Sequence, residues 1–191
     1  MLFSILKFSV ITSFVLGFSA NSAGIKPLVD ENRAYEDKDV MLRFVQFTPQ
    51  QIGSFYEGRG FNKQAVNKLM ASCYVTVIVK NKTNNILWVD LDRWEFIQQG
   101  QSFYRQSRAY WEQQWEKINL KQAHRSTFGW TLMPDVRNLY PNEGVGGRIP
   151  IPMQTQSFTL TLNFPTGDNQ QGKVKSITMK NLYCKQDKPK K

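Results

Sequence analysis

Residues 73–80, CYVTVIVK, decide the fold of this chain, because apolar side chains occupy both faces of an extended run. One face would carry Val75, Val77 and Val79, and the other Tyr74, Thr76 and Ile78. A β-branched run of this kind is typical of a strand in the core of a sandwich. Residues 158–164, FTLTLNF, alternate strictly, which predicts a second core strand whose inward side chains are Phe158, Leu160, Leu162 and Phe164.

The segment that follows the first strand predicts a hairpin. Residues 81–85, NKTNN, are types that tolerate turn geometry, and residues 86–97, ILWVDLDRWEFI, form a long second strand. The apolar phase slips within that strand, since Leu87 and Val89 are odd-numbered whereas Trp94 and Phe96 are even-numbered. A one-residue shift moves side chains to the opposite face unless a bend absorbs it, so we predict an irregularity at Asp92-Arg93.

The remaining segments predict a mainly β protein, a single β-sandwich with short helical insertions at about 49–71 and 107–119. Thr48 and Pro49 are typical of a helix start, and Asn62 begins a second helix. In residues 107–119, Trp111, Trp115 and Ile118 form one apolar stripe. Further strands are predicted at 40–47, 126–132, 147–151 and 173–184.

Four segments resemble small exported immunoglobulin-like domains of bacterial envelopes. They are VTVIVKN at 75–81, LWVDLDRWEF at 87–96, LYPNEGVGGRIPIP at 139–152 and FTLTLNF at 158–164. In such domains a strand that ends in Asn starts a hairpin, and a segment of proline, acid, glycine and aliphatic residues precedes a strand. The resemblance implies the sandwich and an envelope location, but it carries no catalytic residues, and the insertion at 107–119 departs from the minimal domain.

The first 23 residues predict a cleaved signal peptide, which would export the chain to the periplasm or the medium. Lys7 provides the positive region, residues 8–18 are apolar, and Ala20 to Ala23 offer small residues for cleavage. An uncleaved interfacial anchor is the alternative. We expect an extended arm at 24–39, one sandwich domain at 40–184, and a basic disordered tail at 185–191.

Charge and composition favour a core-forming domain whose partners are not nucleic acids. The chain is 41% hydrophobic and 13% aromatic, and removing Lys7 from the net charge of +10 leaves +9. In an envelope, a basic chain and tail would meet acidic glycans or anionic lipid surfaces, although solubility alone explains the same balance. Nucleic acid is excluded by compartment.

Cys73 and Cys184 are the two cysteines of the chain, and both lie in its exported part. Paired cysteines are usual in an oxidising compartment, so we predict a disulfide between them. A reactive thiol would need a nearby base, and His124, the single histidine, has no sequence connection to either cysteine.

Two aromatic groups are candidate binding sites. A regular strand would present Trp88, Asp90, Asp92 and Trp94 on one face, where indoles stack on sugar rings and carboxylates accept hydroxyl hydrogen bonds. The two aspartates also suggest calcium, although two carboxylates are few for that ion. The second candidate, a partner-binding face, consists of Tyr110, Trp111 and Trp115, with Arg105 and Arg108 nearby. Core packing is the structural alternative for both groups.

These observations lead to a non-enzymatic envelope protein that binds another protein or joins an assembly. The alternative is binding of a glycan or anionic envelope surface through Trp88, Trp94 and the basic tail. A hydrolase that uses His124 with Ser126 comes third, since adjacency in sequence is not the geometry that nucleophilic catalysis requires. We expect no catalytic residue, metal or cofactor.

Overall fold

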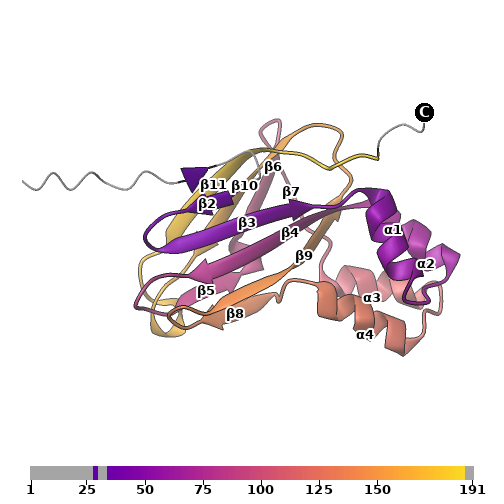
Figure 1. Ribbon diagram of the computed structural model, residues 1–191, viewed down its shortest axis with the longest axis horizontal. Helices are drawn as coiled ribbons and strands as arrows, with labels where there is room; N and C mark the ends of the chain where they lie inside the picture. The colour runs from indigo at the N-terminus through magenta and orange to yellow at the C-terminus, as the bar shows by residue number, and fades with distance from the viewer. Residues whose placement is uncertain (1–27, 30–33, 188–191) are drawn as a thin grey trace, which may run out of the picture.

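The computed structural model describes residues 28–29 and 34–187, so the predicted signal peptide lies outside the described residues. Figure 1 shows the strands gathered at one end of the molecule and the helices α1, α2, α3 and α4 at the other. The described strands form a five-stranded sheet in the order β1-β2-β3-β4-β9, a four-stranded sheet in the order β11-β10-β6-β7, and the pair β5-β8. The prediction of a mainly β fold with short helices is confirmed.

The five-stranded sheet is built around β4 (Ser72–Asn81), the strand whose sequence is apolar on both faces. It pairs in antiparallel fashion with β3 (Val40–Gln46) on one side and with β9 (Gly144–Pro152) on the other. The other members are β1 (Leu28–Val29) and β2 (Ala34–Glu36), and β2 lies within the segment predicted as an extended arm. Central placement of β4 satisfies its backbone on both edges, as a buried strand requires.

The four-stranded sheet packs its inner face against the first. Its members are β6 (Glu95–Gln98), β7 (Gln101–Phe103), β10 (Phe158–Phe164) and β11 (Lys175–Leu182). The strict alternation predicted for 158–164 is confirmed, because every second side chain of β10 is buried. Side chains of both sheets form one aliphatic-rich core that includes Val75, Val77, Val79, Leu160 and Leu162.

The predicted hairpin between residues 73–80 and 86–97 is wrong. β5 (Leu87–Asp90) leaves β4 and pairs with β8 (Val136–Leu139) in the separate two-stranded sheet. The buried side chain of Asn81 explains the departure, because its amide donates to the carbonyl oxygens of Asn85 at 2.7 Å and Leu139 at 2.9 Å. These bonds close the loop onto β8, while both edges of β4 are already occupied.

The irregularity predicted at Asp92-Arg93 is confirmed. A 3₁₀ turn, η1 (Leu91–Arg93), separates β5 from β6. The turn absorbs the change of phase, so Leu87 and Val89 before it and Trp94 and Phe96 after it are all buried. Without such a turn, one of the two pairs would point to solvent.

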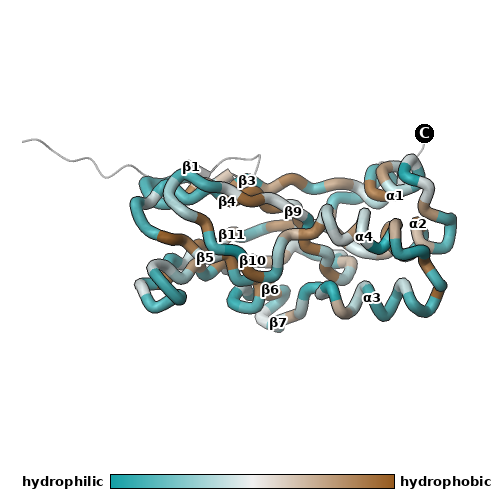
Figure 2. The backbone as a smooth tube through the Cα atoms, turned by 90° about the horizontal axis from the view of Figure 1, so that it is seen from below, coloured by the Kyte–Doolittle hydropathy of each residue, from teal (hydrophilic) through white to brown (hydrophobic). Residues whose placement is uncertain are grey.

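The helical end contains α1 (Pro49–Glu57), α2 (Lys63–Met70), α3 (Arg108–Glu116) and α4 (Gln122–Thr131). The predicted caps are confirmed, because the side chains of Thr48 and Asn62 accept backbone hydrogen bonds from Gln51 and Ala65. The helices enclose a second, aromatic core that includes Tyr56, Tyr74, Trp111, Trp115 and Phe128. Figure 2 shows the helical end beyond the stacked sheets.

The strand predicted at 126–132 is wrong, since these residues form most of α4 and its C-terminal cap. Phe128 and Leu132 are four positions apart, and both are buried in the aromatic core. A spacing of four places side chains on one face of a helix, so the apolar pattern fits helix better than strand.

A short 3₁₀ turn, η2 (Asp168–Gln170), lies between β10 and β11.

The predicted cysteine pair is present, with the Cα atoms of Cys73 and Cys184 5.6 Å apart and the sulfurs at bonding distance. It joins the start of β4 to Cys184, the second residue after β11, and so links the two large sheets. No helix in the described part of the chain has both the length and the apolar character to cross a bilayer. The immunoglobulin-like topology stays a prediction.

Candidate functional site

The four residues of the predicted ligand platform do not share one face, because η1 lies among them. The Trp88 indole is half-buried and donates to the carbonyl oxygen of Gly167 at 2.8 Å. Asp90 caps η1 and pairs with Arg93 at 3.1 Å. Trp94 is 5% exposed and packs edge-on against a core phenylalanine. The two indoles therefore form no common surface for a sugar ring.

Asp92 and Trp94 instead line a hollow of about 460 Å³ beside β6 and β7. The Asp92 side chain is exposed and accepts a 2.7 Å hydrogen bond from Arg105. Tyr104, which follows β7, stands at the rim and is 87% exposed. Since Asp90 and Asp92 each pair with an arginine, they do not converge on an ion, and no metal-binding cluster exists among residues 28–29 and 34–187.

The aromatic stripe of α3 faces the helical core rather than solvent. Trp111 and Trp115 are 2% and 0% exposed, and both contact Phe128, with ring centroids 4.9 and 5.3 Å apart. Tyr110 is the one member of the predicted partner-binding group that reaches the surface. Burial of both indoles supports the packing alternative and leaves a partner little of this stripe to contact.

The most exposed aromatic side chain of the helical end, Trp130, is not predicted from the sequence. Trp130 on α4 is 89% exposed and lies on the rim of a hollow of about 410 Å³ between α3 and α4. The strand predicted at 126–132 gave no reason to expect the Trp130 side chain at the surface. The spacing of Phe128 and Leu132 was the available signal, because a helix that buries both of them turns Trp130 outward.

A chain of ion pairs runs from Arg105, the residue after Tyr104, to Arg108, which contacts the residue before Trp130. Arg105 donates to Asp92 and to Asp135, both at 2.7 Å. Arg108 lies 3.5 Å from Asp135 and donates to the carbonyl oxygen of Gly129, the neighbour of Trp130, at 3.0 Å. We call this surface the aromatic–arginine strip, which comprises Asp92, Tyr104, Arg105, Arg108, Trp130 and Asp135.

Electrostatics of the strip are balanced, because its two arginines face two aspartates. Arg105 is only 15% exposed in its side chain and uses both ends of its guanidinium fork, which fixes its plane. The strip thus contains two guanidinium groups held by ion pairs, and its two arginines and two aspartates leave no net charge that would attract ions in general.

His124 and Ser126 do not form a catalytic pair. The His124 ring packs on Phe61, with centroids 4.8 Å apart, whereas exposed Ser126 lines the hollow between α3 and α4. Residues two apart in a helix point to different sides, so the hydroxyl and the imidazole of this pair do not face each other.

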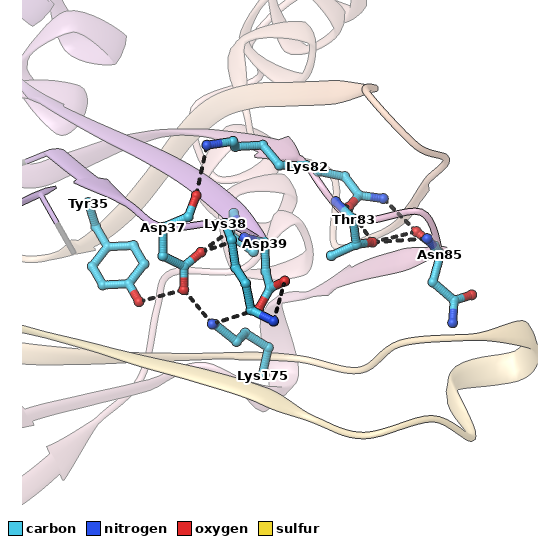
Figure 3. A network of polar contacts seen from close by, with 10 residues as sticks. Tyr35, Asp37, Lys38, Asp39, Lys82, Thr83, Asn85 and Lys175 are labelled. Carbon is cyan, nitrogen blue, oxygen red and sulfur yellow. Dashed lines mark hydrogen bonds and ion pairs between the residues drawn. The ribbon is translucent and has the colours of Figure 1, made fainter. Parts of the chain in front are cut away.

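A partly buried network of polar side chains joins the two large sheets, as Figure 3 shows. Lys175 of β11 pairs with Asp37 and, at 3.1 Å, with Asp39 in the turn between β2 and β3. Asp37 also accepts hydrogen bonds from the Tyr35 hydroxyl and two backbone amides. Every carboxylate oxygen of Asp37 has a partner within the chain, so we assign this network to stability.

The network shifts the pKa of its groups in opposite directions. Burial acts to raise the pKa of Asp37, but the hydrogen bonds from Lys175, the backbone and Tyr35 outweigh it and lower that pKa. Burial acts to lower the pKa of Lys175, but its bonds to Asp37 and Asp39 raise it. Burial and the bond to Asp37 raise the pKa of Tyr35. The charged forms of Asp37 and Lys175 therefore stabilise the fold together.

No protein-family model matches the sequence, and comparison with curated proteins gives no match. Among solved structures, the chain is similar to a Bacillus subtilis protein, ycdA, described as a "putative lipoprotein", with 10% sequence identity and a TM-score of 0.43. The similarity covers 80% of this chain and 39% of that chain, so the match spans about two fifths of the other protein. No function is carried over from it.

Proposed function

We propose that the protein is an exported, non-enzymatic module of a bacterial envelope that binds another protein through the aromatic–arginine strip. The observation that carries this proposal is the exposure of Trp130, at 89%, on the rim of a hollow. Tryptophan is highly buried on average in folded proteins, and a partner that covers an exposed indole removes apolar area from water.

The chemistry of the neighbouring residues supports a protein partner. Tryptophan, tyrosine and arginine are the types that dominate binding energy at protein interfaces. In the strip, ion pairs through Asp135 join Arg105, which follows Tyr104 in the chain, to Arg108, which donates to Gly129 next to Trp130. These ion pairs hold the arginines in place before binding, which reduces the entropy that association would otherwise lose.

Export is supported by the sequence of residues 1–23 and by the Cys73–Cys184 pair, since disulfides persist in oxidising compartments. Fractionation of cells that make the chain, followed by N-terminal sequencing, tests this part. A mature chain that starts near residue 23 or 24 in the periplasm or medium is expected. Intact chain in the cytoplasm contradicts it.

The binding proposal is tested by affinity capture from the envelope fraction with the purified mature chain. Trp130→Ala and Tyr104→Ala should each lose at least tenfold of the captured partner. Tyr140→Ala is the matched control, because Tyr140 is an exposed aromatic residue outside the strip, between β8 and β9. Equal capture by all variants, or equal loss in the Tyr140 control, would contradict the role of the strip.

Glycan binding is the second candidate, and we propose Trp130 as its site. Trp88 and Trp94 form no platform, but Trp130 exposes an indole beside a hollow with polar lining that includes Glu112, Gln122 and Ser126. Such an arrangement suits stacking on a sugar ring with hydroxyl hydrogen bonds. Isothermal titration calorimetry with soluble peptidoglycan fragments separates the two: saturable binding that Trp130→Ala abolishes favours the glycan.

A further inference from the structure

A third hollow, of about 590 Å³, lies beside α1. It is lined by Phe47, Gln50, Gln51, Ser54, Phe55 and Arg148. Two of these groups are aromatic rings and one is a guanidinium, so the hollow combines apolar walls with one permanent positive charge. It shares no residue with the strip and is independent of the function proposed for it.

Arg148 is held over the aromatic rings by its position on β9. Its guanidinium carbon lies 4.2 Å from the Phe55 centroid and 5.3 Å from that of Phe47. One nitrogen donates to the hydroxyl of Tyr56 at 3.2 Å. Stacking and this single hydrogen bond orient the planar group, which still has further N–H donors to offer.

No carboxylate lies within ion-pair distance of Arg148 in the described part of the chain. The other half-buried arginines differ, because Arg105 pairs with two aspartates and Arg125 with two glutamates. A partly desolvated cation without a counter-charge is unfavourable, and an anion that enters the hollow would relieve that cost.

A second guanidinium adds to the positive potential at this wall. Arg59 lies 3.5 Å from the same Phe55 centroid and donates to the Phe55 carbonyl oxygen, and it too has no carboxylate partner among the described residues. Two cations around one ring, with no acid between them, favour a ligand that carries negative charge.

The chain itself shows which anion fits the rim of this hollow. The carboxylate of Asp187, in the C-terminal segment, accepts hydrogen bonds from the backbone N–H of Gln50, at 3.1 and 3.3 Å to its two oxygens. Gln50 also lines the hollow. An aspartate side chain is therefore already accommodated at Gln50, one of the residues that line the hollow.

We propose that this hollow binds an acidic side chain of a protein partner, with its carboxylate on the Arg148 guanidinium. A neighbouring apolar residue of the partner would pack on Phe47 and Phe55. The planar fork of arginine matches a carboxylate with two parallel hydrogen bonds, and stacking on Phe55 keeps that fork in place.

The test is an NMR titration of the full mature chain with two blocked dipeptides, acetyl-Phe-Asp-amide and acetyl-Phe-Asn-amide. The aspartate peptide should shift the Arg148 Nε–H and Phe55 ring signals saturably, with at least tenfold weaker binding of the asparagine peptide. Arg148→Gln should abolish the Phe55 shifts, and Arg148→Lys should weaken binding severalfold. Arg137→Gln, at an exposed arginine of β8, is the matched control and should bind normally.

Melting curves establish that each variant is folded before it is titrated. Equal shifts with the aspartate and asparagine peptides would overturn the proposal, as would unchanged binding by folded Arg148→Gln. Inorganic phosphate provides the third arm. Displacement of the aspartate peptide by phosphate at comparable concentration would replace the proposed peptide site with a general anion site.

Discussion

The sheets and the helical end of this protein are stabilised in different ways. The sheet core is rich in valine and leucine, and it is closed by the Cys73–Cys184 pair and the Asp37–Lys175 network. The helical core consists largely of aromatic rings, and the described residues offer no hydrogen-bond partner to the buried indole N–H groups of Trp111 and Trp115. These two indoles therefore stabilise the helical core through apolar area and ring contacts.

This difference indicates how the two regions divide their tasks. The sheets are cross-linked between layers, so local opening there requires breaking covalent or ionic links. The helical end has no disulfide, and both proposed binding surfaces border it: the strip borders α3 and α4, and the Arg148 hollow borders α1. Regions that bind are commonly drawn from the less cross-linked part of a fold.

The disulfide should give the largest effect. Replacing both cysteines by serine frees a loop of 111 residues in the unfolded chain, which chain-entropy reasoning equates with a loss of up to about 4–5 kcal/mol. Urea unfolding of the double variant, compared with oxidised wild type, measures the loss. A drop of less than about 1 kcal/mol would show that the sheets do not depend on this link.

Trp115→Ala should be nearly as damaging, because it empties the centre of the helical core. Trp115 is 0% exposed, and cutting a buried tryptophan to alanine costs about 3–5 kcal/mol. The melting temperature should fall by many degrees, as calorimetry would show. A variant that melts like wild type would overturn the assignment of this helix to packing and return it to the candidate interfaces.

Asp37→Asn should have an intermediate effect, about 1–2 kcal/mol at neutral pH, because it weakens a partly buried charged network. The pKa of Asp37 is lowered in the fold, so its contribution is present above the unfolded pKa of about 4 and is lost as pH falls through the folded pKa. The pKa of Lys175 is raised, so its contribution is lost as pH rises through a value above about 10.5.

The free energy of unfolding, measured from neutral to acidic pH, checks the direction of the Asp37 shift. Wild type should lose stability on acidification more steeply than Asp37→Asn, since the variant lacks the titrating group. Parallel curves below about pH 4 would contradict the lowered pKa of Asp37 and leave the sheets without this ionic link.

Trp130→Ala should have the smallest effect on stability, within about 0.5 kcal/mol, because Trp130 is exposed. It is the matched control for Trp115→Ala, since the same substitution is made on the neighbouring helix. Chemical denaturation measures both. A loss of several kcal/mol for Trp130→Ala would mean that this indole supports the helical core, and the comparison between a buried and a presented tryptophan would fail.

Local sequence determined several elements of this protein because their signals act over a few residues. The alternation in FTLTLNF set the inward face of β10, Thr48-Pro49 and Asn62 set two helix starts, and the phase slip located η1. Each of these depends on side-chain period or capping, which neighbouring residues define by themselves.

Only the tertiary structure decided which strands pair and which aromatic residues reach solvent. β4 pairs with β3 and β9, which come from segments outside the predicted hairpin. β5 pairs with β8 instead, and the buried Asn81 amide bonds to Leu139 of β8. Trp111 and Trp130 are the same residue type, yet Trp111 is buried in the helical core and Trp130 is exposed. Burial and strand pairing are set by contacts between distant segments, which a local pattern does not contain.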